Sequence, residues 1–480
     1  MRHARVGAVV LTLAVGCGEV ATAVDAAGTI DAVGIDATPA GAVLAAVTFG
    51  GAADDYLEPT APAPDGDVYV AGAYTGAATV LGTPLVSAGA HDMVIARASL
   101  RGEVRRLDTY GGDDDDRAVT LAVAPDGDVV VVGHYNSSTV NFGGAALTNA
   151  GAAGTPDTFV ARLGPDGTHR WSRRLSGPGG TDYGRGVVVT PAGDVVVAAS
   201  LSGNDVYLDA AHGPYTAAGG DDILLAKLDG ATGNIAWARL FGGTNLDVPW
   251  HLALAPNGTL FLVGSTRSPA LAFDDVTLDE IVPGVQFDGF VAAFTPEGQT
   301  IWARRLGGAV NDSIIHLVTT AANSVVVAVT FGDEVDFGGA SAEVSDGGTD
   351  GALVEYSSSG AFLGLTRLRG PADDRLTGVW AGADGALVVA ATTTGEATFA
   401  GATFTAAAGA IEAWVAELTP ARTVDWSHAF GADVEVGPTS TVVGEAEVAV
   451  VGYFRGTLPI PGGVVTAAGE RDGFWLTFAR

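Results

Sequence analysis

The sequence is short of basic residues, cysteine and long apolar runs, and each shortage excludes a class of protein. Its 480 residues include 24 Lys and Arg against 55 Asp and Glu, which gives a formal net charge of −31. We therefore expect no nucleic-acid partner, because phosphate binding requires clustered basic charge. The single cysteine excludes an intramolecular disulfide and a metal site with several thiolates. No apolar run is long enough to cross a bilayer as a helix.

The N-terminus carries the pattern of an export signal. Two arginines within Met1–Arg5 precede the eleven mostly aliphatic residues Val6–Gly16, which predicts a secretory signal peptide over residues 1–16. The end of this run, Leu13-Ala-Val-Gly-Cys17, resembles a bacterial lipoprotein signal, although Ala14 stands where such signals usually carry Leu. The resemblance implies that Cys17 is acylated and becomes the new N-terminus. The alternative is an ordinary signal peptide with an incidental cysteine.

The residues after Cys17 predict a tether and a location. Residues 17–41 are mainly Ala, Thr, Asp, Gly and Val without sustained strand or helix periodicity, which is typical of a flexible linker. We expect an outer membrane lipoprotein of the cell envelope, periplasmic or surface-exposed, because Gly18 is not the Asp that favours inner-membrane retention. A protein this acidic is repelled by anionic surfaces, so we expect it to contact the membrane only through lipidated Cys17.

One seven-residue segment, typified by Asp157-Thr-Phe-Val-Ala-Arg-Leu163, recurs along the chain. Its seven copies begin 60 to 66 residues apart, at Asp92, Asp157, Asp222, Asp288, Asp350, Glu412 and Asp472. Such a period is the mark of a repeat architecture. Each unit also contains a turn such as Pro125-Asp-Gly-Asp128 between two apolar runs, which predicts a hairpin.

Each unit therefore reads as four strands, and no segment between units has helical periodicity. Seven such units predict an all-β fold, a seven-bladed β-propeller of four-stranded antiparallel blades over residues 42–480. The last unit stops at Arg480 after its third strand, whereas Ala42–Phe49 aligns with the fourth strand of the other units. We therefore expect the N-terminal strand to lie beside Gly473–Phe478 and close the last blade, which removes exposed sheet edges.

The combined pattern Gly-Gly-x-x-Asp-Asp, Pro-x-Gly-Asp-Val and Asp-x-Phe-Val-Ala-Arg-Leu is similar to the seven-bladed β-propeller repeats of bacterial surface lipoproteins and secreted proteins. The resemblance covers about residues 42 to 480 and implies architecture and exterior location rather than a particular chemistry. The segment Ala226–Trp237 resembles the tryptophan-docking motif of quinoprotein propellers, which locks neighbouring blades together, and no quinone is expected from it. We interpret the fourth-strand tryptophans as structural repeat residues: Trp171, Trp237, Trp302 and Trp426.

Acidic residues follow the fourth strand of each unit. They are Asp54, Asp55, Asp115, Asp116, Asp182, Asp247, Asp312, Asp373 and Asp374, with Asp433 and Glu435 at the corresponding place in the last unit. These turns and the long connections after the second strands should emerge on one face, where carboxylates could bind calcium. The alternative is that Asp side chains accept hydrogen bonds from backbone amides and build the turns.

No histidine pair has the spacing of a zinc-binding helix, and no recognisable nucleophile motif is present, so we expect no catalytic residues and no cofactor except possible calcium. Departures from the repeat are better candidates for ligand contact. They are Trp250-His251, the Tyr135–Ser138 step, Tyr74, Phe331 and Phe454. Aromatic side chains at loop ends can stack on sugars or can cover the end of a sheet.

These observations predict a monomeric, non-enzymatic binding or scaffold protein that takes a protein or glycan ligand through one loop-rich face. The alternative is a glycan hydrolase or lyase with its site in the central cleft. A deep mouth holding a carboxylate pair or a histidine cluster would favour catalysis, and a flat or Val-filled channel would favour binding. A purely structural role in the envelope is a third possibility.

Overall fold

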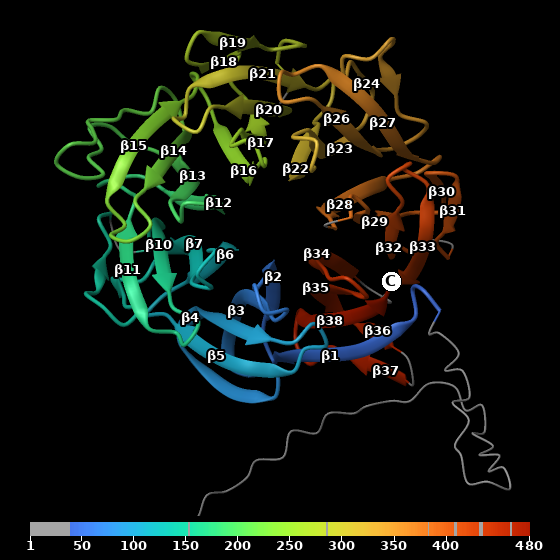
Figure 1. Ribbon diagram of the computed structural model, residues 1–480, viewed down its shortest axis with the longest axis horizontal. Helices are drawn as coiled ribbons and strands as arrows, with labels where there is room; N and C mark the ends of the chain where they lie inside the picture. Colours follow the sequence, from blue (N-terminus) through green and yellow to red (C-terminus); the bar gives the residue numbers. More distant parts are fainter. Residues whose placement is uncertain are drawn as a thin grey trace, which may run out of the picture.

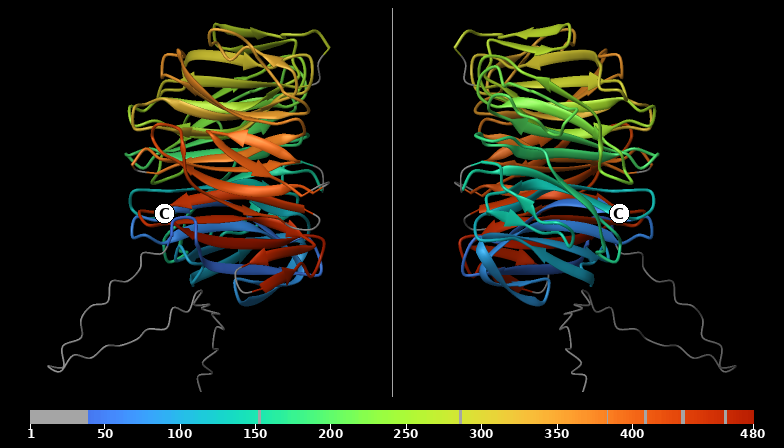
Figure 2. Two further views of the ribbon diagram at one scale, coloured as in Figure 1. Left: turned by 90° about the vertical axis from the view of Figure 1, so that its right-hand side faces the viewer. Right: turned by 90° about the vertical axis from the view of Figure 1, so that its left-hand side faces the viewer.

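The computed structural model describes residues 39–480 except 152–153, 285–286, 383, 408–409, 432–434 and 461–462. These residues form strands and turns, and they contain no helix that could span a membrane. The strands are arranged as a ring of antiparallel sheets around a central axis (Figure 1). Figure 2 shows the ring from its edge, with the strands running between its two faces. The predicted all-β propeller is confirmed.

The principal strands fall into seven antiparallel groups of four. The innermost strands are β2 (Tyr56–Pro62), β6 (Asp116–Val123), β12 (Tyr183–Val189), β16 (Asp247–Leu254), β22 (Ser313–Thr319), β28 (Asp374–Ala381) and β34 (Glu435–Val443). The second strands are β3 (Val68–Val80), β7 (Val129–Tyr135), β13 (Val195–Leu201), β17 (Leu260–Thr266), β23 (Val325–Phe331), β29 (Leu387–Thr393) and β35 (Glu447–Arg455).

The third strands carry the recurring acidic segment, and the fourth strands form the rim. The third strands are β4 (Thr83–Ala98), β10 (Asp157–Leu163), β14 (Asp222–Leu228), β20 (Asp288–Phe294), β26 (Asp350–Tyr356), β32 (Glu412–Leu418) and β38 (Asp472–Ala479). The fourth strands are β5 (Val104–Tyr110), β11 (His169–Arg174), β15 (Ile235–Phe241), β21 (Thr300–Leu306), β27 (Phe362–Arg369), β33 (Val424–Phe430) and β1 (Val43–Gly51).

Short hairpins occupy the connections between second and third strands. They are β8 (Thr139–Val140) with β9 (Leu147–Thr148), β18 (Ala270–Phe273) with β19 (Val276–Asp279), β24 (Glu334–Val335) with β25 (Glu343–Val344), β30 (Glu396–Phe399) with β31 (Ala402–Thr405), and β36 (Thr457–Ile460) with β37 (Gly463–Thr466). In the first blade the extended strands β3 and β4 form this hairpin themselves.

The N-terminal strand closes the ring as expected. β1 pairs antiparallel with β38, in a register that runs from Val43 opposite Phe478 to Phe49 opposite Gly473. The end of β1 then continues onto β3, where Gly50 lies opposite Thr79. The first and last blades are thereby joined into one sheet. The two ends of the described chain meet in the last blade.

The hydrophobic core lies between the blades rather than inside any one of them. The buried residues form seven clusters, and each cluster combines side chains from two adjacent blades. One cluster, for example, joins Phe261 and Val263 of β17 to Val327 and Val329 of β23. A single four-stranded sheet cannot bury both of its faces alone, so each blade depends on its neighbours for stability.

Candidate functional site: the mouth of the central channel

The seven innermost strands enclose a central channel that contains a cavity of about 860 Å³. The two ends of the channel differ in chemistry. Where the strands begin, the lining includes Glu58, Arg185, Trp250 and Tyr453. Where they end, a second cavity is lined mainly by Ala, Val, Leu, Thr and Pro side chains. We call the first end the polar mouth, and it opens on the face that carries the acidic turns.

Each innermost strand contains a register shift at the same place in its pairing with the second strand. A β-bulge of this kind leaves one residue unpaired and re-aims its side chain. The residues at this position that line the channel are Glu58, Val119, Arg185, Trp250, Thr377 and Thr439. We call these six residues the bulge ring. The fold thus repeats the backbone feature in every blade while the sequence changes the side chain.

Arg185 is the cation of the bulge ring. Its guanidinium lies over two aromatic rings, 4.6 Å from the centroid of Trp250 and 5.1 Å from that of Tyr183. Among the described residues it forms no ion pair, and its buried Nε has no hydrogen-bond partner. Burial lowers the pKa of Arg185, and the negative charge of Asp221 opposes this shift. The aromatic faces therefore stabilise a positive charge whose hydrogen-bonding capacity is only partly used.

Glu58 is the anion of the bulge ring. Burial raises its pKa, and the positive charges of Arg117, Arg185 and Arg471 oppose that rise. Two of these arginines are already paired, since Arg117 lies 2.8 Å from Asp115 and Arg471 lies 3.1 Å from Glu435. Within the described part of the chain, the carboxylate of Glu58 has neither a hydrogen-bond nor an ion-pair partner. The mouth therefore presents one unpaired charge of each sign.

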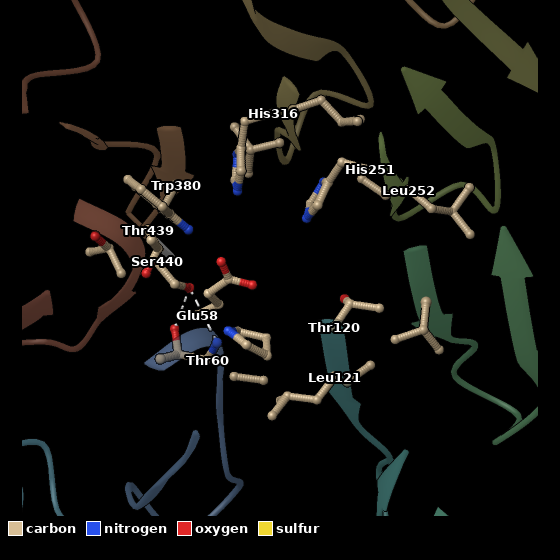
Figure 3. A pocket seen from close by; sticks show the side chains of 18 of the residues that line it. Glu58, Thr60, Thr120, Leu121, His251, Leu252, His316, Trp380, Thr439 and Ser440 are labelled. Carbon is tan, nitrogen blue, oxygen red and sulfur yellow. Dashed lines mark hydrogen bonds between the residues drawn. The ribbon is translucent and has the colours of Figure 1, made fainter. Parts of the chain in front are cut away.

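Aromatic side chains line the next part of the channel wall. The imidazoles of His251 and His316 stack with 4.3 Å between their centroids, and Trp380 lies 4.9 Å beyond His316. Figure 3 shows these three rings around the cavity, which Glu58 also lines. Trp380 reaches this level by folding over Gly378, where an added Cβ would lie 2.2 Å from the indole. Burial lowers the pKa of His251 to about 4, so its imidazole is neutral at neutral pH.

Hydroxyl groups complete the lining between the first and last blades. The Thr60 and Ser440 hydroxyl oxygens lie 2.7 Å apart, and the Thr60 backbone N–H donates to the Ser440 Oγ at 3.2 Å (Figure 3). The Thr439 hydroxyl donates to the Leu57 carbonyl at 2.9 Å. These contacts connect β2 to β34 across the point where the ring closes. The channel thus offers charged, aromatic and hydroxyl groups around one cavity.

The acidic turns are placed at the start of the innermost strands, and their carboxylates accept hydrogen bonds from their own turns. The Gly112 N–H donates to Asp116 at 2.7 Å, the Gly243 N–H to Asp247 at 2.6 Å, and the Gly308 N–H to Asp312 at 2.7 Å. Asp116 also accepts from the Ser137 N–H and hydroxyl, which tie it to the loop after the second strand. This geometry is that of a turn-building residue.

Other members of the set contact connections that lie elsewhere in the sequence, or a charged side chain. The Asp55 carboxylate accepts from the Thr75 N–H, Asp182 from the Ser202 N–H, and Asp373 from the Thr349 N–H, whereas Asp115 pairs with Arg117. Asp54 forms a backbone bridge to Arg471, and Asp433 lies outside the described residues. No three His, Cys, Asp or Glu side chains of the described chain converge as metal ligands would. Calcium binding by these turns stays a prediction.

Burial raises the pKa of the turn carboxylates that begin the innermost strands. The pKa rises to about 6 for Asp55 and Asp116, and to about 7 for Asp182, Asp312 and Asp374. Desolvation is the largest cause, and backbone hydrogen bonds oppose it. The last blade has no such Asp, since Val436 occupies the equivalent place in its pairing with β35.

The fourth-strand tryptophans contact the turn of the next blade. The Trp171 Nε1 donates to the Gly230 carbonyl at 2.7 Å, and the Trp302 Nε1 donates to the Ser358 carbonyl at 3.0 Å. Trp237 lies in the same way against Gly298. Trp426 differs, because its Nε1 donates to Glu417 at 2.7 Å within its own sheet. These contacts are structural, and none of the four side chains enters the channel lining.

The departures from the repeat separate into two groups. Tyr74, Phe331 and Phe454 are buried in the blade cores, so they cover sheet ends and are not available to a sugar. Trp250 and His251 line the channel. Arg185, Glu58 and His316 were not singled out from the sequence. Superimposing the innermost strands on the Asp that six of the seven carry, and the last on Val436, would have placed these side chains in two adjacent columns, in which charged and aromatic residues replace small ones.

The N-terminal predictions fall outside the described residues. These are the signal peptide at residues 1–16, the acylation of Cys17 and the tether as far as residue 38.

No family model matches the chain. The regulatory protein FlaEY of Caulobacter vibrioides is 25% identical over 427 residues, which cover 84% of this chain and 42% of that protein. An uncharacterized WD repeat-containing protein of Acanthamoeba polyphaga mimivirus is 23% identical over 195 residues, which cover 38% of this chain and 14% of that protein. BamB from Moraxella catarrhalis is a similar solved structure, with 11% identity, a TM-score of 0.37, and coverage of 90% of this chain and 99% of that chain. The chain spans less than half the length of the two sequence relatives.

Proposed function

We propose that this chain is a non-enzymatic binding protein of the bacterial cell envelope, exported by its N-terminal signal, anchored through acylated Cys17, and holding its ligand in the polar mouth of the propeller channel. The bulge ring carries this proposal. Seven innermost strands share one backbone irregularity, and the six residues of the bulge ring that it directs into the channel are of five kinds. A purely architectural position would carry the same small residue in every blade.

The site is also well suited to binding in its energetics. Arg185 and Glu58 are partly desolvated and lack partners among the described residues. Leaving such groups without partners costs free energy, which a complementary ligand recovers on binding. A cavity of about 860 Å³ lies within the range of small-molecule and oligosaccharide sites. The site thus combines a suitable volume with unused hydrogen-bonding capacity.

The alternative, an enzyme acting on glycans, is favoured by the stacked pair of His251 and His316, because a histidine cluster in the mouth is the feature that we expected of a catalytic channel. His251 is a neutral imidazole in a deep cavity, and its Nδ1 has no hydrogen-bond partner among the described residues. A hydrolase of the usual kind needs two carboxylic acids, whereas Glu58 is the one acid among the described residues that line this cavity. A lyase needs a base and a proton donor for the leaving oxygen, and neither has to be a carboxylic acid, so the enzymatic alternative narrows to elimination chemistry.

Binding is tested by comparing two aromatic variants of the full chain. Trp250→Ala removes a wall of the mouth, and Tyr207→Ala removes an exposed ring outside the channel lining. Both variants, matched in melting temperature, are applied to a glycan array and to an envelope extract of a Gram-negative bacterium. We expect Trp250→Ala to lose ligands that the wild type and Tyr207→Ala retain. Equal retention by all three proteins would exclude the channel mouth as the site.

The anchor is tested separately, by labelling cells with radioactive palmitate. We expect incorporation into the wild-type chain and none into Cys17→Ser. Labelling of Cys17→Ser, or none in the wild type, would contradict lipidation at Cys17.

A further inference from the structure

Arg185 and its surroundings indicate what chemical class of ligand the mouth takes. This inference rests on the proposed function, because it assumes that the channel mouth is a binding site. The guanidinium lies over the rings of both Tyr183 and Trp250, and Nε is its one nitrogen buried without a partner. Two aromatic faces restrict the rotation of the planar group. A held guanidinium presents its N–H groups in a fork that matches a carboxylate.

Two other arginines near the mouth, Arg117 and Arg471, are already paired with carboxylates. Arg117 donates from Nε to Asp115 at 2.8 Å, and Arg471 lies 3.1 Å from Glu435 while stacking on Tyr453. Both carry a carboxylate from their own chain. Among the described residues Arg185 has no ion pair, and the charges of Asp221 and Glu58 act on it only at a distance. An anionic ligand would supply the partner that Arg185 lacks.

The rest of the wall is suited to a ring that carries hydroxyl groups. The indole of Trp380 offers an aromatic face, and Thr60, Thr120 and Ser440 offer hydroxyls. Glu58, lacking a partner, accepts hydrogen bonds from hydroxyl donors. The backbone N–H of Val379 donates to the His316 Nδ1 at 3.4 Å, which places the proton of the neutral ring on Nε2 as a further donor. These groups pair with sugar hydroxyls rather than with a hydrocarbon.

We propose that the polar mouth binds an acidic sugar, a hexuronate or an oligomer of hexuronates, with the sugar carboxylate held by the Arg185 fork and the sugar hydroxyls by Glu58 and the channel hydroxyls. The net charge of −31 repels an anionic ligand at long range. Exposed charges farther away than about 8 Å are largely screened at physiological ionic strength, whereas Arg185 is inside the mouth. The aromatic walls also strengthen the local attraction by excluding water.

The ligand class is tested by titrating the full chain with matched sugars, using saturation-transfer NMR and tryptophan fluorescence. The probes are galacturonate and glucuronate, their trimers, the neutral sugars galactose and glucose, methyl galacturonate, which lacks the charge, and trialanine, which offers a peptide carboxylate. We expect uronates to bind about tenfold or more tightly than the neutral sugars and the ester, as a charged hydrogen-bond pair requires. The trimers distinguish a polymer ligand from a free sugar.

Variants of Arg185 distinguish bidentate hydrogen bonding by the guanidinium from the effect of its positive charge alone. Arg185→Met should lose uronate binding by about tenfold or more, and Arg185→Lys should lose part of it because an ammonium group cannot pair in a bidentate manner. The matched control is Arg304→Met, since Arg304 also stacks on a ring, 5.4 Å from Tyr356, but does not line the channel. If Arg185→Met fails to fold, Arg185→Lys and the comparison of uronate with its ester on the wild type still test the proposal.

Three outcomes would overturn the proposal. These are equal affinity for uronate and its ester, unchanged binding by Arg185→Met, and preference for trialanine. If no sugar binds while Trp250→Ala still loses captured ligands, the ligand class is wrong and the binding function stands. If neither comparison shows an effect, the binding function is wrong as well. Formation of an unsaturated uronate, seen by ultraviolet absorbance, would confirm the ligand class and replace simple binding with elimination.

Discussion

The imidazole rings of His251 and His316, on innermost strands of neighbouring blades, stack with 4.3 Å between centroids and 24° between planes. Each ring follows the bulge of its strand by one residue. The same backbone irregularity in two adjacent blades therefore brings together two side chains that are 65 positions apart in the sequence. Burial lowers the pKa of both rings, and the proximity of His251 lowers that of His316 further.

This pair should stay neutral far into the acid range. We expect His251 to titrate near pH 4 rather than near 6.5, because burial penalises the imidazolium form. NMR chemical shifts of the imidazole nitrogens measure this directly, and His251→Phe assigns the signal. The pair also contributes stability that is present above pH 6.5 and lost as the pH falls toward 4, since the unfolded chain binds the proton first. Titration of His251 near pH 6.5 would contradict the prediction.

The turn carboxylates should act on stability with the opposite sign. Burial raises the pKa of Asp312 from 3.8 to about 7, so the folded chain binds this proton more tightly than the unfolded chain. Its stabilising contribution is present below pH 3.8 and is lost as the pH rises through about 7. The Asp312→Asn substitution keeps the shape of the side chain but removes its titratable group. We expect it to cost on the order of 1–2 kcal/mol at pH 5, because the amide cannot accept both backbone hydrogen bonds.

The difference in free energy of unfolding between Asp312→Asn and the wild type should be smaller at pH 8 than at pH 5. At pH 8 the wild type carries a buried charge. Urea unfolding at the two pH values measures this difference, and Glu297→Gln in an exposed turn serves as the control. A difference that grows with pH would show that the carboxylate is better stabilised when ionised than when protonated.

The blades could be predicted from the sequence because each unit carries its own turn and strand signals. Pro125-Asp-Gly-Asp128 forms a turn whose Gly127 has a φ of 85°, and the following Val129–Tyr135 strand is buried throughout. The closing strand could be predicted because Ala42–Phe49 supplied the element that the last unit lacked. These features depend on the local sequence and on the number of strands in each unit. A repeat shows both.

The channel lining could be predicted only in part. Trp250-His251 stood out because two large rings interrupt an otherwise small-residue pattern. Arg185 did not, because an arginine between Gly184 and Gly186 looks like a solvated residue. The direction of the Arg185 side chain depends on a bulge that arises from pairing with β13. The register of this pairing is a property of the assembled sheet. The stacking of His251 on His316 likewise requires the blades to be placed around the axis.

The contact between Trp171 and Gly233 should be a specific lock between two blades. Gly233 has a φ of 68°, and a Cβ there would lie 2.6 Å from the indole of Trp171. Gly193 has a similar φ of 90° but has no atom within 4 Å of the same position. Both Ala variants pay the backbone cost of about 1 kcal/mol. We expect Gly233→Ala to lose roughly 1–3 kcal/mol more than Gly193→Ala, from steric overlap, as measured by urea unfolding. Equal losses would exclude the lock.

Closure of the ring by β1 should keep the chain monomeric. The ring of Phe49 lies on Gly473, where no Cβ would fit, and Phe49 is buried in the cluster between the first and last blades. Removing residues 1–49 exposes the backbone edge of β38, and an unpaired edge is a template for pairing with a second chain. We expect this truncated chain to self-associate in analytical ultracentrifugation and to melt earlier than the full chain. The matched control lacks only residues 1–38 and keeps β1, so it should remain a monomer. If both truncated chains sediment as equally stable monomers, β1 is dispensable for closing the ring.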